Sequence, residues 1–83
     1  MNQAILFPDR EWWDESANAI CFPALVNGFQ ILCAIDGESL IRRFGKDKEV
    51  IESFRQHRWD LEEEAEAAIK AEKEDAQGWI WLS

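Results

Sequence analysis

The stretch AICFPALVNGFQILCAI, residues 19–35, contains two apolar runs that are rich in β-branched and aromatic residues. The runs flank Asn27-Gly28, a pair preferred in two-residue type I′ turns, and therefore predict a β-hairpin. A turn at this pair places four apolar pairs on one side of the hairpin, namely Val26 with Phe29, Ala24 with Ile31, Phe22 with Cys33 and Ile20 with Ile35. We expect this side to face the core.

The opposite side of the hairpin is more apolar than a fully solvated face, because it carries Cys21, Pro23, Leu25, Leu32 and Ala34 beside Gln30. We expect another element to cover part of it. Pro23 cannot donate a hydrogen bond to a neighbouring strand, so it predicts a local edge or a bulge. A bulge would bring Cys21 opposite Cys33 as a redox pair, but buried reduced thiols are the favoured interpretation.

Short strands are predicted on both sides of this hairpin. The run AILF, residues 4–7, predicts a first strand that ends at the turn pair Pro8-Asp9. A brief extended piece follows at Trp12 and Trp13, whose side chains then point to opposite faces. Near the other end, Gly78 leads into WIWLS, which predicts a last strand with Trp79 and Trp81 on one face.

The chain after the hairpin has helical periodicity. Asp36 predicts the N-cap of a short helix over 37–44 with Gly45 as its stop, and Asp47 can cap the next helix. An apolar stripe recurs at helical spacing and predicts one long helix over about 48–75: it comprises Val50, Phe54, His57, Leu61, Ala65 and Ala68. Such a helix would span about 43 Å, against a diameter of about 30 Å for a globule of this size. We therefore expect its end to overhang, fray, kink or pack on a second subunit.

These elements predict one α+β domain over residues 1–83, with a small antiparallel sheet of three to four strands, built on the hairpin 19–35, packed on the long helix. The formal net charge is -8. Residues 60–75 carry eight acids and two lysines, whereas residues 42–58 carry six basic and three acidic side chains. A pI near 4.5 opposes binding to nucleic acid. Without a leader or an apolar span, a cytoplasmic location with no membrane contact is expected.

No catalytic or metal-binding pattern is present in the sequence. His57 lies on the apolar stripe and is expected at the edge of the core, with Asp60 three residues away as an unspecific partner. The H-E-x-x-H spacing, G-x-S-x-G and glycine-rich phosphate loops are absent. We therefore expect no catalytic residue, no metal and no cofactor.

Trp59 does not follow the periodicity of the helix, because it lies about 200° from Leu61 and points away from the stripe. It is expected either to be exposed or to pack under another element. The candidates for interaction are Trp59, His57, Arg55, Arg58, Trp12 and Trp79. They favour a non-enzymatic protein-interaction or regulatory module.

Two alternatives remain open. In the first, Arg55 and Arg58 clamp a small anionic ligand beside His57, with an acid from Asp60 or Glu62, as in a ligand binder or minor enzyme. In the second, the chain forms a homodimer through the overhanging helix or the second sheet face.

Five segments carry a family resemblance: FPDREWWDE (7–15), CFPALVNG (21–28), CAIDGESL (33–40), SFRQHRWDLEEEAE (53–66) and GWIWL (78–82). Over essentially the whole length they resemble the YrdB-like family of small proteobacterial proteins, catalogued as a domain of unknown function. The resemblance implies a short cytoplasmic bacterial protein with an α+β fold. It implies no particular activity, cofactor or catalytic residue.

Overall fold

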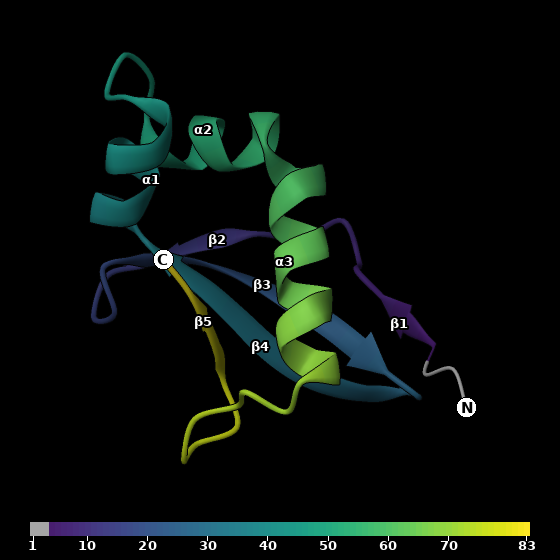
Figure 1. The fold of residues 1–83 in the computed structure, drawn as a ribbon. Coiled ribbons are helices and arrows are strands. Elements are labelled where there is room, and N and C mark those ends of the chain that lie inside the picture. Colours follow the sequence, from purple (N-terminus) through teal and green to yellow (C-terminus); the bar gives the residue numbers. More distant parts are fainter. Residues whose placement is uncertain (1–3) are drawn as a thin grey trace.

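The computed structural model describes residues 4–83 as a five-stranded sheet with helices on one side (Figure 1). In chain order the elements are β1 (Ile5–Leu6), β2 (Trp12–Asp14), β3 (Ala19–Val26), β4 (Phe29–Asp36), α1 (Gly37–Phe44), α2 (Val50–Gln56), α3 (Arg58–Lys70) and β5 (Ile80–Leu82). The α+β class expected from the sequence is confirmed.

The predicted central hairpin is present with the predicted register. β3 pairs with β4 so that Phe22 lies opposite Cys33 and Val26 lies opposite Phe29. Asn27 and Gly28 both have positive φ, as a type I′ turn requires. The turn chemistry and the apolar alternation therefore agree on one register.

The sheet is mixed, so the prediction of an antiparallel sheet with three to four strands was wrong. The order is β1-β3-β4-β5, and β2 pairs with β3 beside β1. β5 runs parallel to β4. Three helices connect β4 to β5, and they bring the chain back so that β5 begins beside Cys33. A parallel pair needs a long crossover connection of this kind.

Pro23 lies at a local edge of β3, as expected. On the side away from β4, β2 pairs with residues 19–21 and β1 pairs with Leu25 and Val26. The proline falls in the interval between the two pairings, where a missing N–H costs no ladder bond. No bulge occurs, because Pro23 remains in register with Leu32.

The two cysteines consequently lie on opposite faces of the hairpin. Cys21 is opposite Ala34, whereas Cys33 is opposite Phe22 on the core side. Both are free, buried thiols. This arrangement agrees with the prediction of buried reduced thiols and excludes a Cys21–Cys33 redox pair in this fold.

The prediction for α1 is confirmed at both ends. The Asp36 carboxylate accepts the backbone N–H of Ser39 at 3.1 Å and its hydroxyl at 2.7 Å, and Gly45 ends the helix with φ of 89°. The predicted cap at Asp47 was wrong, since Glu49 precedes the next helix and makes no side-chain capping bond.

The prediction of one long helix over about 48–75 was also wrong. The chain breaks at His57, with φ of -112° and ψ of 19°, into α2 and α3. α2 contacts α1 and β3, whereas α3 covers β5. α3 ends at Lys70, followed by Glu72 with positive φ. Of the expected alternatives, the kink is the one found, and it turns each half toward a different partner.

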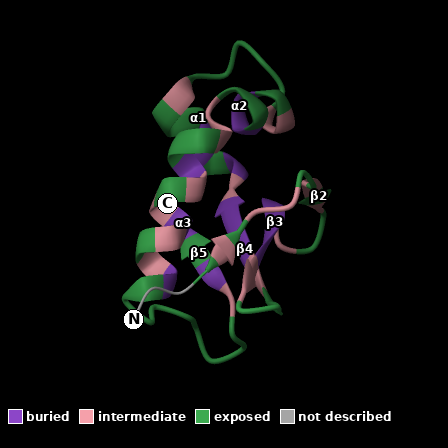
Figure 2. Cartoon of the chain, turned by 90° about the vertical axis from the view of Figure 1, so that its right-hand side faces the viewer, coloured by how far each residue is buried: buried purple, intermediate pink, exposed green. Residues whose placement is uncertain are grey.

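The main core lies between the helices and one face of the sheet. Figure 2 shows the buried parts of α3 facing β3 and β4. The buried members are Ile20, Phe22, Ala24, Cys33, Ile35, Leu40, Phe54, Leu61, Ala65, Ile69, Ile80 and Leu82. No helix within residues 4–83 is both long and apolar enough to span a bilayer.

Candidate functional site

The sheet face away from the helices carries a row of four side chains, one from each of four neighbouring strands. Trp12 pairs with Cys21, Cys21 with Ala34, and Ala34 with Trp81. The two small residues in the middle are completely buried. They form a second, smaller core cluster with Ala19, covered by Trp12, Ala17 and Trp79. We expected another element to cover part of this face, and the side chains that do so are mainly the two indoles of Trp12 and Trp79.

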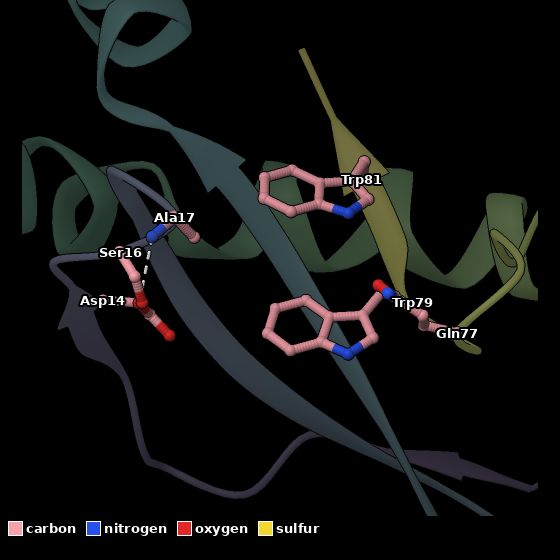
Figure 3. Close-up of a pocket in the computed structure, with 6 residues that line it drawn as sticks. All are labelled: Asp14, Ser16, Ala17, Gln77, Trp79 and Trp81. Atoms are coloured by element: carbon pink, nitrogen blue, oxygen red, sulfur yellow. Dashed lines mark hydrogen bonds between the residues drawn. The ribbon is translucent and has the colours of Figure 1, made fainter.

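Trp79 and Trp81 lie on one face, as their spacing predicted, and they form a stacked pair beside this cluster. Their ring centroids are 5.9 Å apart and their planes differ by 15°. Trp81 is 44% exposed and Trp79 is half-buried. A hollow of about 270 Å³ separates the pair from the turn that carries Asp14, Ser16 and Ala17 (Figure 3). The indoles thus form one wall of an open, partly apolar hollow.

The facing wall is a tight turn between β2 and β3. Oδ1 of Asp14 accepts the Ser16 hydroxyl at 2.9 Å and the Ala17 backbone N–H at 3.1 Å. The Ala17 N–H, together with the Ser16 hydroxyl, lowers the pKa of Asp14 below its ordinary value. The turn therefore presents an ionised carboxylate across the hollow from the indoles.

A second acidic turn fixes the position of Trp79. Oδ1 of Asp75 accepts the backbone N–H groups of Gln77 and Trp79, both at 2.9 Å. The Asp75 N–H in turn donates to the Trp79 carbonyl oxygen at 2.8 Å. The Trp79 N–H is also the largest cause of the lowered pKa of Asp75. Gly78 supplies the positive φ of this loop. The backbone that carries Trp79 is consequently held in place by this turn.

The structure separates the tryptophans predicted for interaction. Trp12 and Trp79 belong to the cluster on the helix-free face. Trp59 is on α3 and is 80% exposed, which agrees with the exposed alternative. Arg10 lies over the Trp12 ring, 5.6 Å from its centroid.

Arg55 and Arg58 are engaged by the chain's own carboxylates. Both pair with Glu11, and Arg58 also donates to Glu62 at 2.7 Å. The remaining Arg58 donors reach the carbonyl oxygens of Pro8 at 2.7 Å and Arg10 at 3.2 Å. The hydrogen bond from Arg55 is the largest cause that lowers the pKa of Glu11. The clamp predicted for an external anion therefore holds an internal one.

His57 lies at the junction of α2 and α3. Its ring stacks on Phe44, with centroids 3.7 Å apart and planes within 9°. Nδ1 donates to the Ser53 carbonyl oxygen at 2.9 Å, so this nitrogen is directed to the backbone rather than to Asp60. The expected position at the edge of the core is confirmed. In the described part of the chain, no three His, Cys, Asp or Glu side chains are grouped to hold a metal ion.

Trp81, Asp14 and Asp75 were absent from the predicted site. The two-residue spacing of Trp79 and Trp81 was the available signal for the first. For the acids, the signal is weaker, because Asp14 and Asp75 stand in polar turn clusters that look like ordinary loops in the sequence. Only the tertiary structure brings residue 14 opposite residues 79 and 81.

Comparisons with known proteins confirm the family resemblance. A family model described as "Protein of unknown function (DUF1488)" matches residues 5–82. Proteins named "Uncharacterized protein YrdB" from Escherichia coli (strain K12) and Shigella flexneri are 64% and 63% identical over 84 residues, and each match covers 99% of both chains.

A solved structure supports the fold. The 1.60 Å crystal structure of a protein of unknown function from the DUF1488 family of Shewanella loihica PV-4 matches with a TM-score of 0.92 and 35% identity. The match covers 99% of this chain and 94% of that chain. The chain therefore belongs to the DUF1488 family of proteins of unknown function.

Proposed function

We propose that the protein is a non-enzymatic interaction module of the bacterial cytoplasm that binds a protein partner through the helix-free sheet face. The observation that carries the proposal is the stacked Trp79–Trp81 pair, which is open to solvent beside the hollow. Tryptophan is enriched among the residues that dominate the energy of protein interfaces. A pair with one exposed and one half-buried indole on one sheet face is suited to that role.

The rigidity of the surface supports the same function. The Asp75 turn fixes Trp79, and the Asp14 turn fixes the opposite wall. Side chains that are already ordered lose little conformational entropy on binding. The buried floor of Cys21 and Ala34 also gives the indoles a packed support.

Trp59 is the weaker anchor, although it is more exposed than Trp81. It stands alone on α3, between the charged residues Arg58 and Asp60. A single exposed apolar side chain is ordinary on a protein surface, whereas an apolar group beside a hollow is more typical of a binding site.

The geometry does not favour the anionic-ligand alternative. Four Arg58 hydrogen bonds go to protein acceptors, and the Arg58 side chain is only 16% exposed. An incoming anion would have to displace Glu11, which is itself bound by two guanidinium groups. The arginines serve to join the segment before β2 to the helices.

The test is affinity capture from a bacterial lysate with the wild type, Trp81→Ala and Trp59→Ala side by side. We expect a partner that the wild type and Trp59→Ala retain and that Trp81→Ala loses. Circular dichroism checks that both variants are folded. The purified partner is then titrated by calorimetry, where Trp81→Ala should weaken binding by about thirtyfold, as for the loss of a central aromatic anchor.

Two results would contradict the proposal. One is equal retention of every captured protein by folded Trp81→Ala and wild type. The other is the absence of any specific partner from lysates prepared under several growth conditions.

A further inference from the structure

We propose that the partner presents a basic segment, with an arginine guanidinium stacked over the Trp79–Trp81 pair and ion-paired with Asp14. The inference rests on the proposed function and specifies the chemistry of its partner. Three independent features of the described residues support it: the charge around the hollow, the arginine contacts elsewhere in the fold, and the free oxygen of Asp14.

The charge around the hollow favours a cation. Asp14 contributes the one charged side chain among the residues that line it, and the others are Ser16, Ala17, Gln77, Trp79 and Trp81. The neighbouring loop adds Glu72, Glu74 and Asp75 against Lys73, and the whole chain has a net charge of -8. A positively charged segment is therefore attracted at long range and meets a carboxylate at contact.

The fold already uses the proposed contact inside the molecule. Arg43 lies over Phe44 at 5.1 Å and Arg58 over Phe54 at 5.4 Å from the ring centroids. Each of these arginines also pairs with a carboxylate, Arg43 with Glu64 at 3.0 Å and Arg58 with Glu11. A guanidinium that stacks on a ring and pairs with an acid thus occurs twice.

The Trp79–Trp81 surface has the ring and the acid of this arrangement without the guanidinium. Within residues 4–83, the aromatic rings that have an arginine over them are those of Trp12, Phe44 and Phe54. Indole is the aromatic side chain that attracts cations most strongly. The planar guanidinium also stacks on such rings, which a lysine ammonium does not do. An arginine from a partner would complete the third example.

Asp14 has an oxygen available for this pairing. Both turn hydrogen bonds from Ser16 and Ala17 end on Oδ1. Oδ2 has no protein hydrogen bond among the described residues, and the carboxylate lies across the hollow from both indoles (Figure 3). The turn therefore fixes the carboxylate through one oxygen and leaves the other to accept from a guanidinium.

The test uses two capped heptapeptides of glycine and serine, one with a central arginine and one with citrulline, its uncharged planar counterpart. Proton–nitrogen NMR spectra of ¹⁵N-labelled protein follow the five indole N–H signals separately. We expect the arginine peptide to shift the signals of Trp79 and Trp81 and not that of Trp59. Citrulline should weaken binding by about tenfold, from the lost ion pair and cation–π attraction.

A matched pair of variants isolates the carboxylate. Asp14→Asn keeps an oxygen that can accept the turn hydrogen bonds but loses the charge, and it should weaken the arginine peptide by about fivefold. Glu15→Gln removes the same charge from the adjacent exposed residue, which does not line the hollow, and should change the affinity less than twofold.

Each contrary result separates this inference from the proposed function. Equal binding of the arginine and citrulline peptides at Trp79 and Trp81 would overturn the basic partner and leave the interaction surface standing. An absence of shifts from the arginine peptide overturns the inference, while capture of a Trp81-dependent partner would still support the function. A dimer in light scattering that Asp14→Asn dissolves would replace the partner protein by a second copy of this chain.

Discussion

Arg58→Met should reduce the stability of the fold substantially, because Arg58 fastens the segment before β2 to the start of α3. Its guanidinium pairs with Glu11 and Glu62 and donates to the carbonyl oxygens of Pro8 and Arg10. Methionine keeps much of the apolar stem and removes all of these hydrogen bonds. The variant therefore tests the hydrogen bonds more than the packing.

The magnitude follows from the burial of the pair. The side chains of Arg58 and Glu11 are 16% and 13% exposed, so loss of Arg58 leaves a largely buried carboxylate with one remaining partner. We expect a loss of about 2 kcal/mol in the free energy of unfolding, less than for a fully buried pair. The corresponding fall in melting temperature is about 8–16 °C for a domain of this size.

Urea unfolding followed by tryptophan fluorescence measures this loss, and Arg55→Met is the matched control. Arg55 is 53% exposed and makes one hydrogen bond to Glu11, so its loss should cost about 0.5 kcal/mol. Equal, small losses for the two variants would refute the structural role of Arg58. A large rise in wild-type melting temperature with phosphate, abolished by Arg58→Met, would instead support the anionic-ligand alternative.

The pH dependence gives a second measure of the same network. The pKa of Glu11 lies below its ordinary value of 4.5 in the folded protein, mainly because of Arg55. Its contribution is therefore present in full above that pH and disappears as pH falls through the lowered pKa. The difference in stability between wild type and Glu11→Gln should shrink over this acidic range and remain constant near neutrality.

The other predictions concern the cap, the core and the thiols. Asp36→Ala should lower the free energy of unfolding in urea by about 1 kcal/mol, because it removes the cap on the Ser39 N–H. The pKa of Asp36 lies below 3.8, mainly through the hydrogen bond from the Ser39 hydroxyl. This loss should therefore vanish as pH falls through that lowered pKa. Phe54→Ala should cost about 3–5 kcal/mol, since Phe54 is completely buried with its ring centroid 4.9 Å from that of Phe22, and circular dichroism should show a chain close to unfolding. Burial raises the pKa of Cys21 to about 11 and that of Cys33 to about 12. Both thiols should therefore resist alkylation at about pH 8 in the native state and react in denaturant, and mass spectrometry can count the modified thiols.

The central hairpin was predictable because two local signals agree. Asn27-Gly28 selects the turn, and alternation of apolar residues selects the face, so a shift by one residue would expose the core side. The cap at Asp36 and the stop at Gly45 were predictable for the same reason, since both act within one helical turn. Tertiary contacts are not needed to identify any of these features.

The break at His57 was not predictable from periodicity, because the apolar stripe continues through it. Length alone does not force the break either, because one continuous helix from Val50 to Lys70 would span about 32 Å. This is less than the longest dimension of the molecule, 41 Å. The two halves of the stripe pack on different elements, because α2 contacts α1 and β3 while α3 contacts β5. A break at His57 lets each half face its own partner. His57 lies at the junction of α2 and α3, and its ring stacks on Phe44 of α1.

The direction of β5 determines which residues meet at the candidate surface. Parallel pairing with β4 places Trp81 beside Ala34 and Leu82 beside Ile35, toward the end of the sheet where Ala19 pairs with Asp36. Asp14 pairs with Ala19 at that same end. With β5 reversed, the order of Trp79 and Trp81 along the sheet would be reversed as well, and the hollow would have different walls.

The sequence pattern does not fix this direction, because the connection between β4 and β5 is long enough for either one. A parallel pair needs a long crossover connection, and the three helices between β4 and β5 supply one. The observed parallel pairing then places Trp81 beside Ala34, at the hollow. Small side chains at Cys21 and Ala34 then let the indoles lie against the sheet, so the surface depends on two unremarkable residues as much as on its tryptophans.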